Sequence, residues 1–169
     1  PLCHACPLDS LCLACAKGVQ EARPVRSARA PVPLREMVGA YIENDRGQWL
    51  ALHRKPRGLL GGLWEIPNFE WASGTSLAME ETLAAMLADS LAITTTRLGL
   101  PQTVSHAYTH FRVRLTVARY AALNEPRLEP HDTWDDLHWL DDERMPSHGL
   151  TGLTLKALAV VRNAPVALL

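Results

Sequence analysis

The sequence lacks any long hydrophobic run, and this absence excludes the simplest kind of membrane protein. No stretch approaches the roughly 20 consecutive apolar residues that a membrane-spanning helix needs. The N-terminus also lacks the basic and apolar regions of a secretory signal peptide. We therefore expect no membrane partner, and a cytoplasmic or otherwise intracellular location.

Cysteine is absent after residue 15, because all four cysteines lie at the start of the chain. Disulfides usually join distant segments of small secreted domains, whereas closely spaced thiols suit a soft metal ion or an iron–sulfur cluster. The two Cys-x-x-Cys pairs are only five residues apart, and zinc ribbons usually separate such pairs by about 15–20 residues. This spacing disfavours zinc without excluding it. The four residues are Cys3, Cys6, Cys12 and Cys15.

The sequence also lacks a strong net charge, because 17 basic residues oppose 18 acidic ones. The two signs are nevertheless separated, with basic residues concentrated in the first third and acidic residues between positions 125 and 143. A basic stretch binds phosphate by releasing counterions, but a solvated linker explains the same composition. Our candidates for contacts with a DNA backbone are Arg26, Arg29, Arg54, Lys55 and Arg57.

The composition predicts one compact domain with an N-terminal appendage. A chain of 169 residues that is 47% hydrophobic buries one core of ordinary size. Residues 23–34 include three prolines, which prevent a regular helix. We predict a cysteine motif within residues 1–22, whose Ala-rich residues 13–22 form a helix, an extended basic linker at 23–34 and a globular domain at 35–169. The linker is either a plain tether or a DNA contact. Because the chain begins with Pro1 rather than Met, we expect it to come from a longer protein, and we expect a monomer.

Strand and helix patterns alternate along the globular domain. Residues 37–43 and 48–54 are rich in β-branched, aromatic and leucine side chains, and the Asn-Asp-Arg-Gly turn between them predicts a hairpin. Apolar residues recur at helical spacing from Leu77 to Leu91, after a helix start at 74–76. Residues 111–118 alternate as a half-buried strand whose polar face is basic.

The order of these elements predicts the fold class. A short strand at 137–140 and a closing helix at 150–162 complete the domain. Strands, helix, strands and helix in this order favour an α+β fold, an α/β sandwich in which helices flank a mixed sheet.

A glycine-rich turn follows the predicted hairpin. The sequence RKPRGLLGGLWEIP runs from Arg54 to Pro67, and Gly61 and Gly62 permit a backbone path that is barred to other residues. The segment resembles the entry of the Nudix fold into its signature loop and helix, in the form found in the C-terminal domains of MutY-type adenine DNA glycosylases. The resemblance implies a Nudix-like (MutT-like) fold.

The helix after this turn departs from the pattern of a working Nudix hydrolase. Such an enzyme uses an Arg-Glu-x-x-Glu-Glu helix to hold the divalent cations that activate water. In the best register those positions hold Ala85, Met86, Asp89 and Ser90. We therefore expect no Mg²⁺ and no hydrolysis of nucleoside diphosphates by this chain.

The cysteine run resembles the cluster loop of helix–hairpin–helix DNA glycosylases, whose pattern is C-x6-C-x2-C-x5-C. The resemblance makes Cys3, Cys6 and Cys12 the last three ligands of a 4Fe–4S cluster in the parent protein, with the first ligand before Pro1. Cys15 lies outside the pattern. It either replaces the fourth ligand, or the three thiols form an incomplete stump.

The segment VSHAYTHF, at residues 104–111, resembles the H-x-F-S-H loop with which MutY C-terminal domains contact 8-oxoguanine. The resemblance puts Tyr108 in the aromatic position, Thr109 in the hydroxyl position and His110 in the imidazole position. An aromatic ring can wedge beside a base, and the two polar groups can sense the N7 hydrogen and C8 carbonyl of the lesion. Without the neighbouring motifs, the same residues fit a core aromatic with surface histidines.

Together these resemblances imply the C-terminal part of a base-excision repair enzyme. The parent glycosylase would remove adenine mispaired with 8-oxoguanine, using catalytic residues in an N-terminal domain that this chain lacks. This chain would verify the lesion in double-stranded DNA without catalysing, and its other partner would be its own N-terminal glycosylase domain. The alternatives are a divergent Nudix hydrolase of oxidised or ordinary nucleoside triphosphates, and a metal-tethered interaction module.

Overall fold

A computed structural model describes residues 1–25, 31–71 and 79–164 of the chain. The chain divides into two compact units, Pro1–Pro31 and Val32–Leu169, each of which is described by itself. Arg26, Arg29 and the predicted helix start at 74–76 lie outside the described residues. Within the described ranges, no helix combines the length and the apolar character needed to cross a bilayer.

The first unit consists of short helical turns. The predicted helix within residues 13–22 is wrong in its extent, because α1 (Leu13–Ala16) has only four residues. Gly18 follows with a φ of 62°, a backbone conformation that glycine adopts without strain and that ends a helix. The remaining turns are 3-10 helices at Cys3–Ala5, Asp9–Leu11 and Gln20–Ala22.

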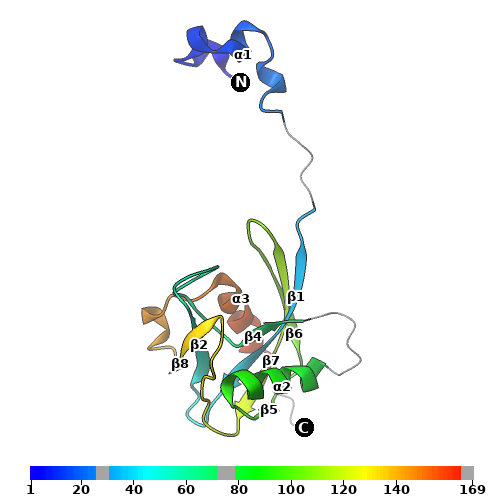
Figure 1. Cartoon of the computed structure of the whole chain (residues 1–169), viewed down its shortest axis with the longest axis vertical. Helices are drawn as coiled ribbons and strands as arrows, with labels where there is room; N and C mark the ends of the chain where they lie inside the picture. The colour runs from blue at the N-terminus through cyan, green and yellow to red at the C-terminus, as the bar shows by residue number, and fades with distance from the viewer. Residues whose placement is uncertain (26–30, 72–78, 165–169) are drawn as a thin grey trace. The chain divides into compact units, whose positions relative to one another are not determined.

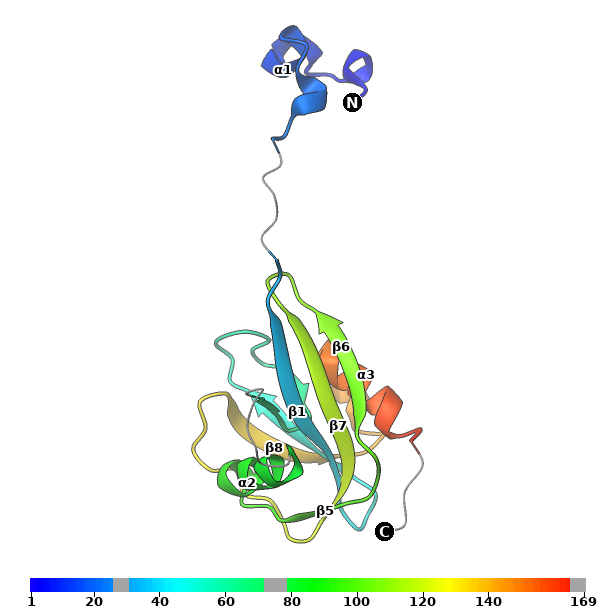
Figure 2. The same cartoon turned by 90° about the vertical axis from the view of Figure 1, so that its right-hand side faces the viewer.

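The second unit is built on a mixed sheet with two long parallel strands at its centre (Figures 1 and 2). Strands β1 (Leu34–Glu43) and β7 (Arg112–Ala122) pair from Leu34 opposite Arg112 to Glu43 opposite Ala121. The other strands pair antiparallel with their neighbours. These are β2 (Trp49–Arg54), β3 (Trp64–Glu65), β4 (Asn68–Glu70), β5 (Thr95–Arg97), β6 (Gln102–Ala107) and β8 (Trp134–Leu140).

Two helices cover the sheet and create two hydrophobic cores. Helix α3 (Gly152–Val161) packs on a cluster that includes Val113 and Leu115 of β7. Helix α2 (Met79–Leu91) packs on a second cluster that includes Ala118 and Tyr120. The α+β class and the sandwich of helices on a mixed sheet are therefore confirmed.

The predicted first hairpin is confirmed, and local hydrogen bonds explain its turn. The Asn44 side-chain oxygen accepts from the backbone N–H groups of Arg46 and Gln48, at 3.0 and 2.9 Å. Gly47 has a φ of 72°, which suits the residue type that the sequence provides there. These turn residues thus determine the conformation of the turn that connects β1 to β2.

The closing helix begins later than predicted, and its start is explained by a cap. The backbone N–H of Thr154 donates to the Thr151 side-chain oxygen at 3.2 Å, which makes Thr151 the N-cap of α3. The predicted strand at 137–140 is also extended at its start, because β8 begins at Trp134.

The loop predicted at residues 104–111 was wrong in its extent, because its first half is a strand. Strand β6 runs to Ala107 and pairs with β7 from Gln102 opposite Val117 to Ala107 opposite Arg112. Only Tyr108, Thr109, His110 and Phe111 remain as the turn of this β6–β7 hairpin. Val104 is the one buried residue of β6, so the strand has little hydrophobic pattern of its own.

The packing of the core predicts that two Leu→Ala substitutions differ strongly in their effect on the free energy of unfolding. Leu115 on β7 is fully buried, whereas Leu155 on α3 is 50% exposed. We expect Leu115→Ala to lower the free energy of unfolding by about 2–5 kcal/mol, because it removes buried methyl groups and leaves a cavity. Leu155→Ala is the control and should change it by less than about 1 kcal/mol. Urea denaturation followed by tryptophan fluorescence measures both, and equal losses would contradict the assigned core.

Candidate functional site

The predicted recognition residues lie at the tip of the β6–β7 hairpin (Figure 2). The Tyr108 N–H donates to the Phe111 carbonyl at 2.9 Å and closes the turn. Thr109 and His110 between them are exposed, while Tyr108 and Phe111 are half-buried against the α3-side core. The turn therefore anchors an aromatic ring and offers a hydroxyl and an imidazole to solvent.

The Tyr108 ring is supported by two other rings. Its centroid lies 4.5 Å from that of His106 and 4.8 Å from that of Phe111. Burial raises the pKa of Tyr108, with a smaller contribution in the same direction from Glu65. The phenol is therefore neutral at physiological pH and is able to donate a hydrogen bond.

His106 packs against the Tyr108 ring, a contact that the sequence did not reveal. It packs so closely on α3 that a Cβ placed at Gly152 would lie 2.9 Å from His106 Cε1. Burial lowers the pKa of His106, and Lys156 lowers it further. Within the described part of the chain, its buried Nδ1 has no hydrogen-bond partner. The spacing of His106 and Gly152 along the chain is too long for pattern analysis to connect them.

Arg54, predicted to contact a DNA backbone, is used inside the fold instead. Its guanidinium donates to the Glu65 carboxylate at 2.6 Å and to the Leu59 carbonyl at 3.0 Å, and its side chain is only 20% exposed. The Trp134 indole donates to the same Glu65 oxygen at 2.8 Å. Glu65 is thus a buried carboxylate held by two donors, and Arg54 is a positioning residue for the glycine-rich turn.

The glycine-rich turn keeps the other two basic candidates on the surface. Lys55 and Arg57 are exposed, and neither contacts a carboxylate among the described residues. A Cβ at Gly61 would lie 2.3 Å from the Pro56 carbonyl oxygen, so the turn closes only with glycine there. Lys55 and Arg57 remain free to meet an anion.

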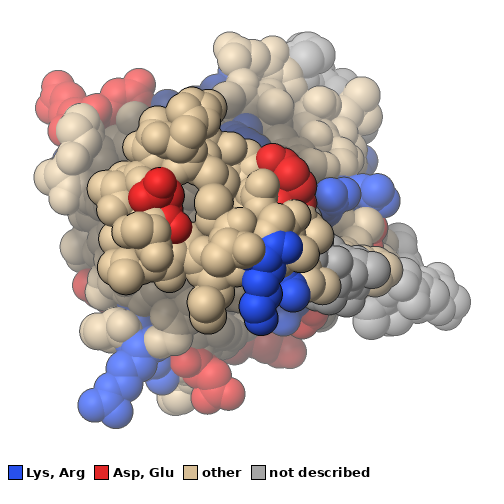
Figure 3. Space-filling model, turned by 90° about the horizontal axis from the view of Figure 1, so that it is seen from above, with Lys and Arg blue, Asp and Glu red and all other residues tan. Residues whose placement is uncertain are grey.

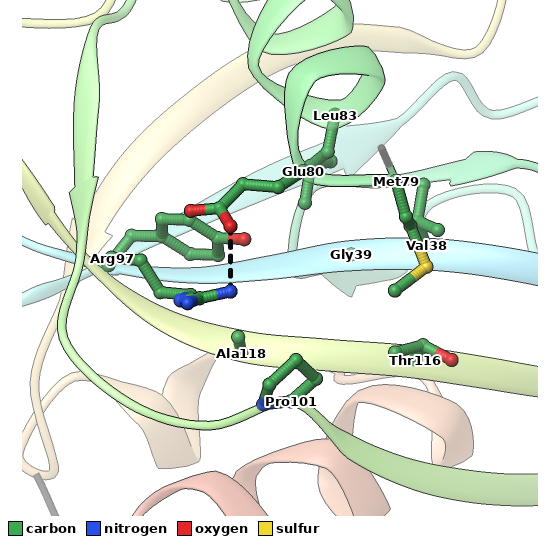
Figure 4. Close-up of a pocket in the computed structure, with 10 residues that line it drawn as sticks. Val38, Gly39, Met79, Glu80, Leu83, Arg97, Pro101, Thr116 and Ala118 are labelled. Carbon is green, nitrogen blue, oxygen red and sulfur yellow. Dashed lines mark hydrogen bonds and ion pairs between the residues drawn. The ribbon is translucent and has the colours of Figure 1, made fainter. Parts of the chain in front are cut away.

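The carboxylates of α2 do not form a metal site. Glu80 points across to β5 and pairs with Arg97 at 2.7 Å (Figure 4). Asp89 is exposed on the same helix. Among the residues that the structure describes, no three His, Cys, Asp or Glu side chains are placed to hold a metal ion. The donor set therefore does not fit the divalent cations of a Nudix hydrolase.

The cavity beside α2 is also small. It lies between α2 and strands β1, β5 and β7, with Gly39, Leu83 and Thr116 among its lining residues (Figure 4). Its volume is about 30 Å³, whereas pockets for drug-sized ligands hold roughly 300–1,000 Å³. A nucleoside triphosphate does not fit into this space.

The cysteines of the first unit are all free thiols. A hydrogen bond with Cys3 raises the pKa of the Cys15 thiol, so the cysteine outside the expected pattern lies beside one inside it. The described arrangement does not bring three of these thiols together as ligands and does not fit a cluster as it stands. The assignment of Cys3, Cys6 and Cys12 as 4Fe–4S ligands stays a prediction.

The face of the protein seen in Figure 3 carries no single patch of positive charge. In the view of Figure 3, the visible Lys and Arg side chains are scattered among acidic and uncharged ones. A concentration of basic side chains does occur at the β6–β7 hairpin, where Arg112, Arg114 and Lys156 line one hollow.

The fold and sequence are similar to those of a known family. A family model described as "NUDIX domain" matches residues 38–160. A MutT NUDIX hydrolase from Burkholderia pseudomallei is 27% identical, with a TM-score of 0.61 over 75% of this chain and 96% of that one.

Two further structures share the fold at lower identity. The MutT protein from Methanosarcina mazei Go1 is 18% identical, with a TM-score of 0.62 over 76% of this chain and 91% of that one. The NUDIX domain of Shewanella oneidensis NrtR, solved with ADP ribose, is 16% identical, with a TM-score of 0.61 over 82% and 93%. These similarities support the Nudix part of the sequence-based prediction and do not support its MutY-type glycosylase part. They favour the alternative, a Nudix hydrolase, over lesion recognition.

The Arg54–Glu65 pair generates a stability prediction. We expect Glu65→Gln to lower the free energy of unfolding by about 3 kcal/mol, because it leaves a largely buried guanidinium without its counter-charge. Glu80→Gln breaks a more exposed pair with Arg97 and should cost less than about 1 kcal/mol. Thermal and urea denaturation of both variants measure the difference. A Glu65→Gln protein as stable as the unchanged chain would refute the structural role of Arg54.

Proposed function

The chain belongs to the NUDIX domain family, and from this premise we propose that its domain recognises 8-oxoguanine opposite adenine in duplex DNA. The observation that carries the proposal is the turn at the tip of the β6–β7 hairpin. It exposes Thr109 and His110 while Tyr108 is anchored in the core beneath them. A protruding turn of this kind reaches base edges in a groove, which a recessed pocket cannot do.

The chemistry of the turn suits the lesion. 8-Oxoguanine differs from guanine by a hydrogen on N7 and a carbonyl at C8, so a reader needs an acceptor and a donor close together. The Thr109 hydroxyl both accepts and donates, and the imidazole of His110 offers either role according to its tautomer. The neutral Tyr108 ring supplies a wedge or a stacking surface, as aromatic side chains do in other lesion and groove binders.

The proposal extends to the parent protein. A MutY-type glycosylase domain preceding this chain would remove the adenine, and the chain would supply the check on the opposite base. The resemblance of the cysteine run to the cluster loop supports this assignment. No step of lesion recognition proposed for the hairpin depends on the cluster.

A second candidate is a Nudix hydrolase acting on an oxidised nucleoside triphosphate. It is favoured by the 27% identity to a MutT NUDIX hydrolase over nearly the whole of that protein. It is opposed by the donor set of α2, where Asp89 alone offers a carboxylate at the four signature positions. Hydrolysis requires several carboxylates to hold the cations, because the diphosphate charge must be neutralised during attack by water.

Removal of one hydroxyl tests the recognition proposal. We expect Thr109→Val to lower the preference for 8-oxoguanine:adenine over guanine:adenine duplexes by about fivefold, the factor that corresponds to loss of one hydrogen bond of about 1 kcal/mol. Fluorescence anisotropy with the two duplexes measures the ratio. Thr103→Val on β6, where Thr103 is exposed but lies away from the turn, is the matched control and should keep the ratio of the unchanged chain.

The duplex preferences of the two variants either support or overturn the recognition proposal. A ratio that is lowered in Thr109→Val and kept in Thr103→Val supports contact between the turn and the lesion. An unchanged chain with no preference, or one whose preference survives both substitutions, overturns the proposal.

The donor set of α2 predicts the outcome of a hydrolysis assay. We expect no release of pyrophosphate from 8-oxo-dGTP above the blank with Mg²⁺ or Mn²⁺, because the cations lack their carboxylate ligands. A MutT-type hydrolase is assayed in parallel as the positive control. Metal-dependent turnover that disappears in Asp89→Asn would establish the second candidate instead.

A further inference from the structure

Basic side chains from three separate elements meet around the β6–β7 hairpin. Arg112 and Arg114 lie at the start of β7, Lys156 lies on α3, and Arg35 lies near the start of β1. Parallel pairing of β1 with β7 puts Arg35 opposite Val113 and Glu36 opposite Arg114. Figure 2 shows the beginning of β1 beside the hairpin at the same end of the domain. We call Arg112, Arg114 and Lys156 the hairpin basic surface.

These cations are less neutralised than most others in the domain. Arg97, Arg119 and Arg162 each pair with a carboxylate. In the hairpin basic surface only Arg114 does so, with Glu36 at 3.0 Å, and it remains 52% exposed. Neither Arg112 nor Lys156 has a carboxylate partner in the described ranges. The surface therefore keeps a positive charge that the fold does not use.

Lys156 of this surface and the neighbouring Arg35 are held by contacts that leave their charge available. The Lys156 ammonium donates to the Ser105 carbonyl at 2.9 Å, which anchors it against the edge strand β6. The guanidinium of Arg35 lies 4.5 Å from the centre of the Phe111 ring, an attractive cation–π arrangement. Each contact is with a neutral group, so neither cancels the charge.

The surface is also hollowed. Arg112, Arg114 and Lys156 line a depression of about 410 Å³ together with Val32 and Leu34. His106 lines it too, and this is the residue whose buried Nδ1 lacks a partner within the described residues. A depression lined by three cations and by exposed apolar side chains fits a phosphate with its attached sugar.

We infer that the hairpin basic surface binds the sugar-phosphate backbone of duplex DNA beside the base that the turn reads. The inference rests on the proposed function for the orientation of the hairpin. A strand rises roughly 3.3 Å per residue, so Arg114 lies roughly 10 Å along β7 from Phe111. The grooves of B-DNA are roughly 7.5–8.5 Å deep. A turn that reaches the base edges therefore brings Arg114 to the level of the phosphates.

This placement differs from the basic candidates that the sequence suggested. Lys55 and Arg57 lie on the glycine-rich turn, separated from the hairpin tip along a different strand pair. Two members of the hairpin basic surface, Arg112 and Arg114, instead follow the hairpin turn directly in the chain. Phosphate contacts there position the turn, since backbone contacts set register and base contacts set specificity.

The salt dependence of DNA binding tests the inference. The test variant is Arg112→Gln, Arg114→Gln, Lys156→Gln, and the matched control, which also removes three exposed cations, is Arg46→Gln, Arg127→Gln, Arg144→Gln. Binding of the whole 169-residue chain to 8-oxoguanine:adenine and guanine:adenine duplexes is measured by anisotropy at several KCl concentrations. Each phosphate contact contributes about 0.9 to the slope of log affinity against log salt. We expect the slope to become shallower by about 2–3 in the test variant and to stay unchanged in the control.

The outcomes separate the two proposals. A test variant that keeps its slope, a control that loses as much, or a chain that binds neither duplex overturns the hairpin basic surface. A shallower slope in the test variant without any lesion preference in the unchanged chain supports the surface and overturns lesion recognition. If the test variant keeps both its lesion preference and its salt slope, lesion recognition is supported and the hairpin basic surface is overturned.

Discussion

The parallel pairing of β1 with β7 is the constraint on which the rest of the domain depends. It joins residues that are almost 80 positions apart in the chain, from Leu34 opposite Arg112 onward. Alternate side chains of the two strands supply both hydrophobic cores, one under α3 and one under α2. The same pairing fixes the end of the sheet at which β7 begins, and so it fixes the position of the β6–β7 turn and of the cations around it. Loss of this register would remove the two cores and the candidate site together.

The domain has the Nudix architecture, while the positions aligned with the metal-binding helix of Nudix hydrolases hold Ala85, Met86, Asp89 and Ser90. The helix that carries metal ligands in Nudix hydrolases here packs a core through Leu83, Leu87 and Leu91. Its acidic residue Glu80 is engaged by Arg97, and the carboxylate of Glu65 is engaged by Arg54 and Trp134. The exposed Thr109 and His110 lie at the hairpin tip, on another part of the sheet. Under the proposed function, the chain would share its fold with hydrolases and bind without hydrolysing, because fold alone does not determine function.

Local patterns in the sequence predicted the parts of the fold that depend on local chemistry. The turn at Asn44–Gly47 and the alternation of β7 were sufficient for their elements, and the class of the fold followed from their order. Strand β6 was missed because Val104 is its one buried residue, so the strand lacks an alternating apolar pattern of its own. The sequence could place Tyr108, Thr109 and His110 in one motif but could not reveal that His106 supports them against Gly152, because that contact joins residues far apart in the chain. Arg54 was misjudged because a basic residue in a glycine-rich turn is indistinguishable from a surface cation until its buried partner Glu65 is known.

The most direct test of the account is the location of the DNA contact on the protein. Backbone amide chemical shifts of the isotopically labelled chain are recorded during titration with a duplex that contains one 8-oxoguanine:adenine pair. The account predicts the largest changes at residues 108–114 and at Lys156, with little change along α2. Changes concentrated on α2 and the glycine-rich turn, with none at the hairpin, would contradict it and would return the ligand site to the place that Nudix hydrolases use.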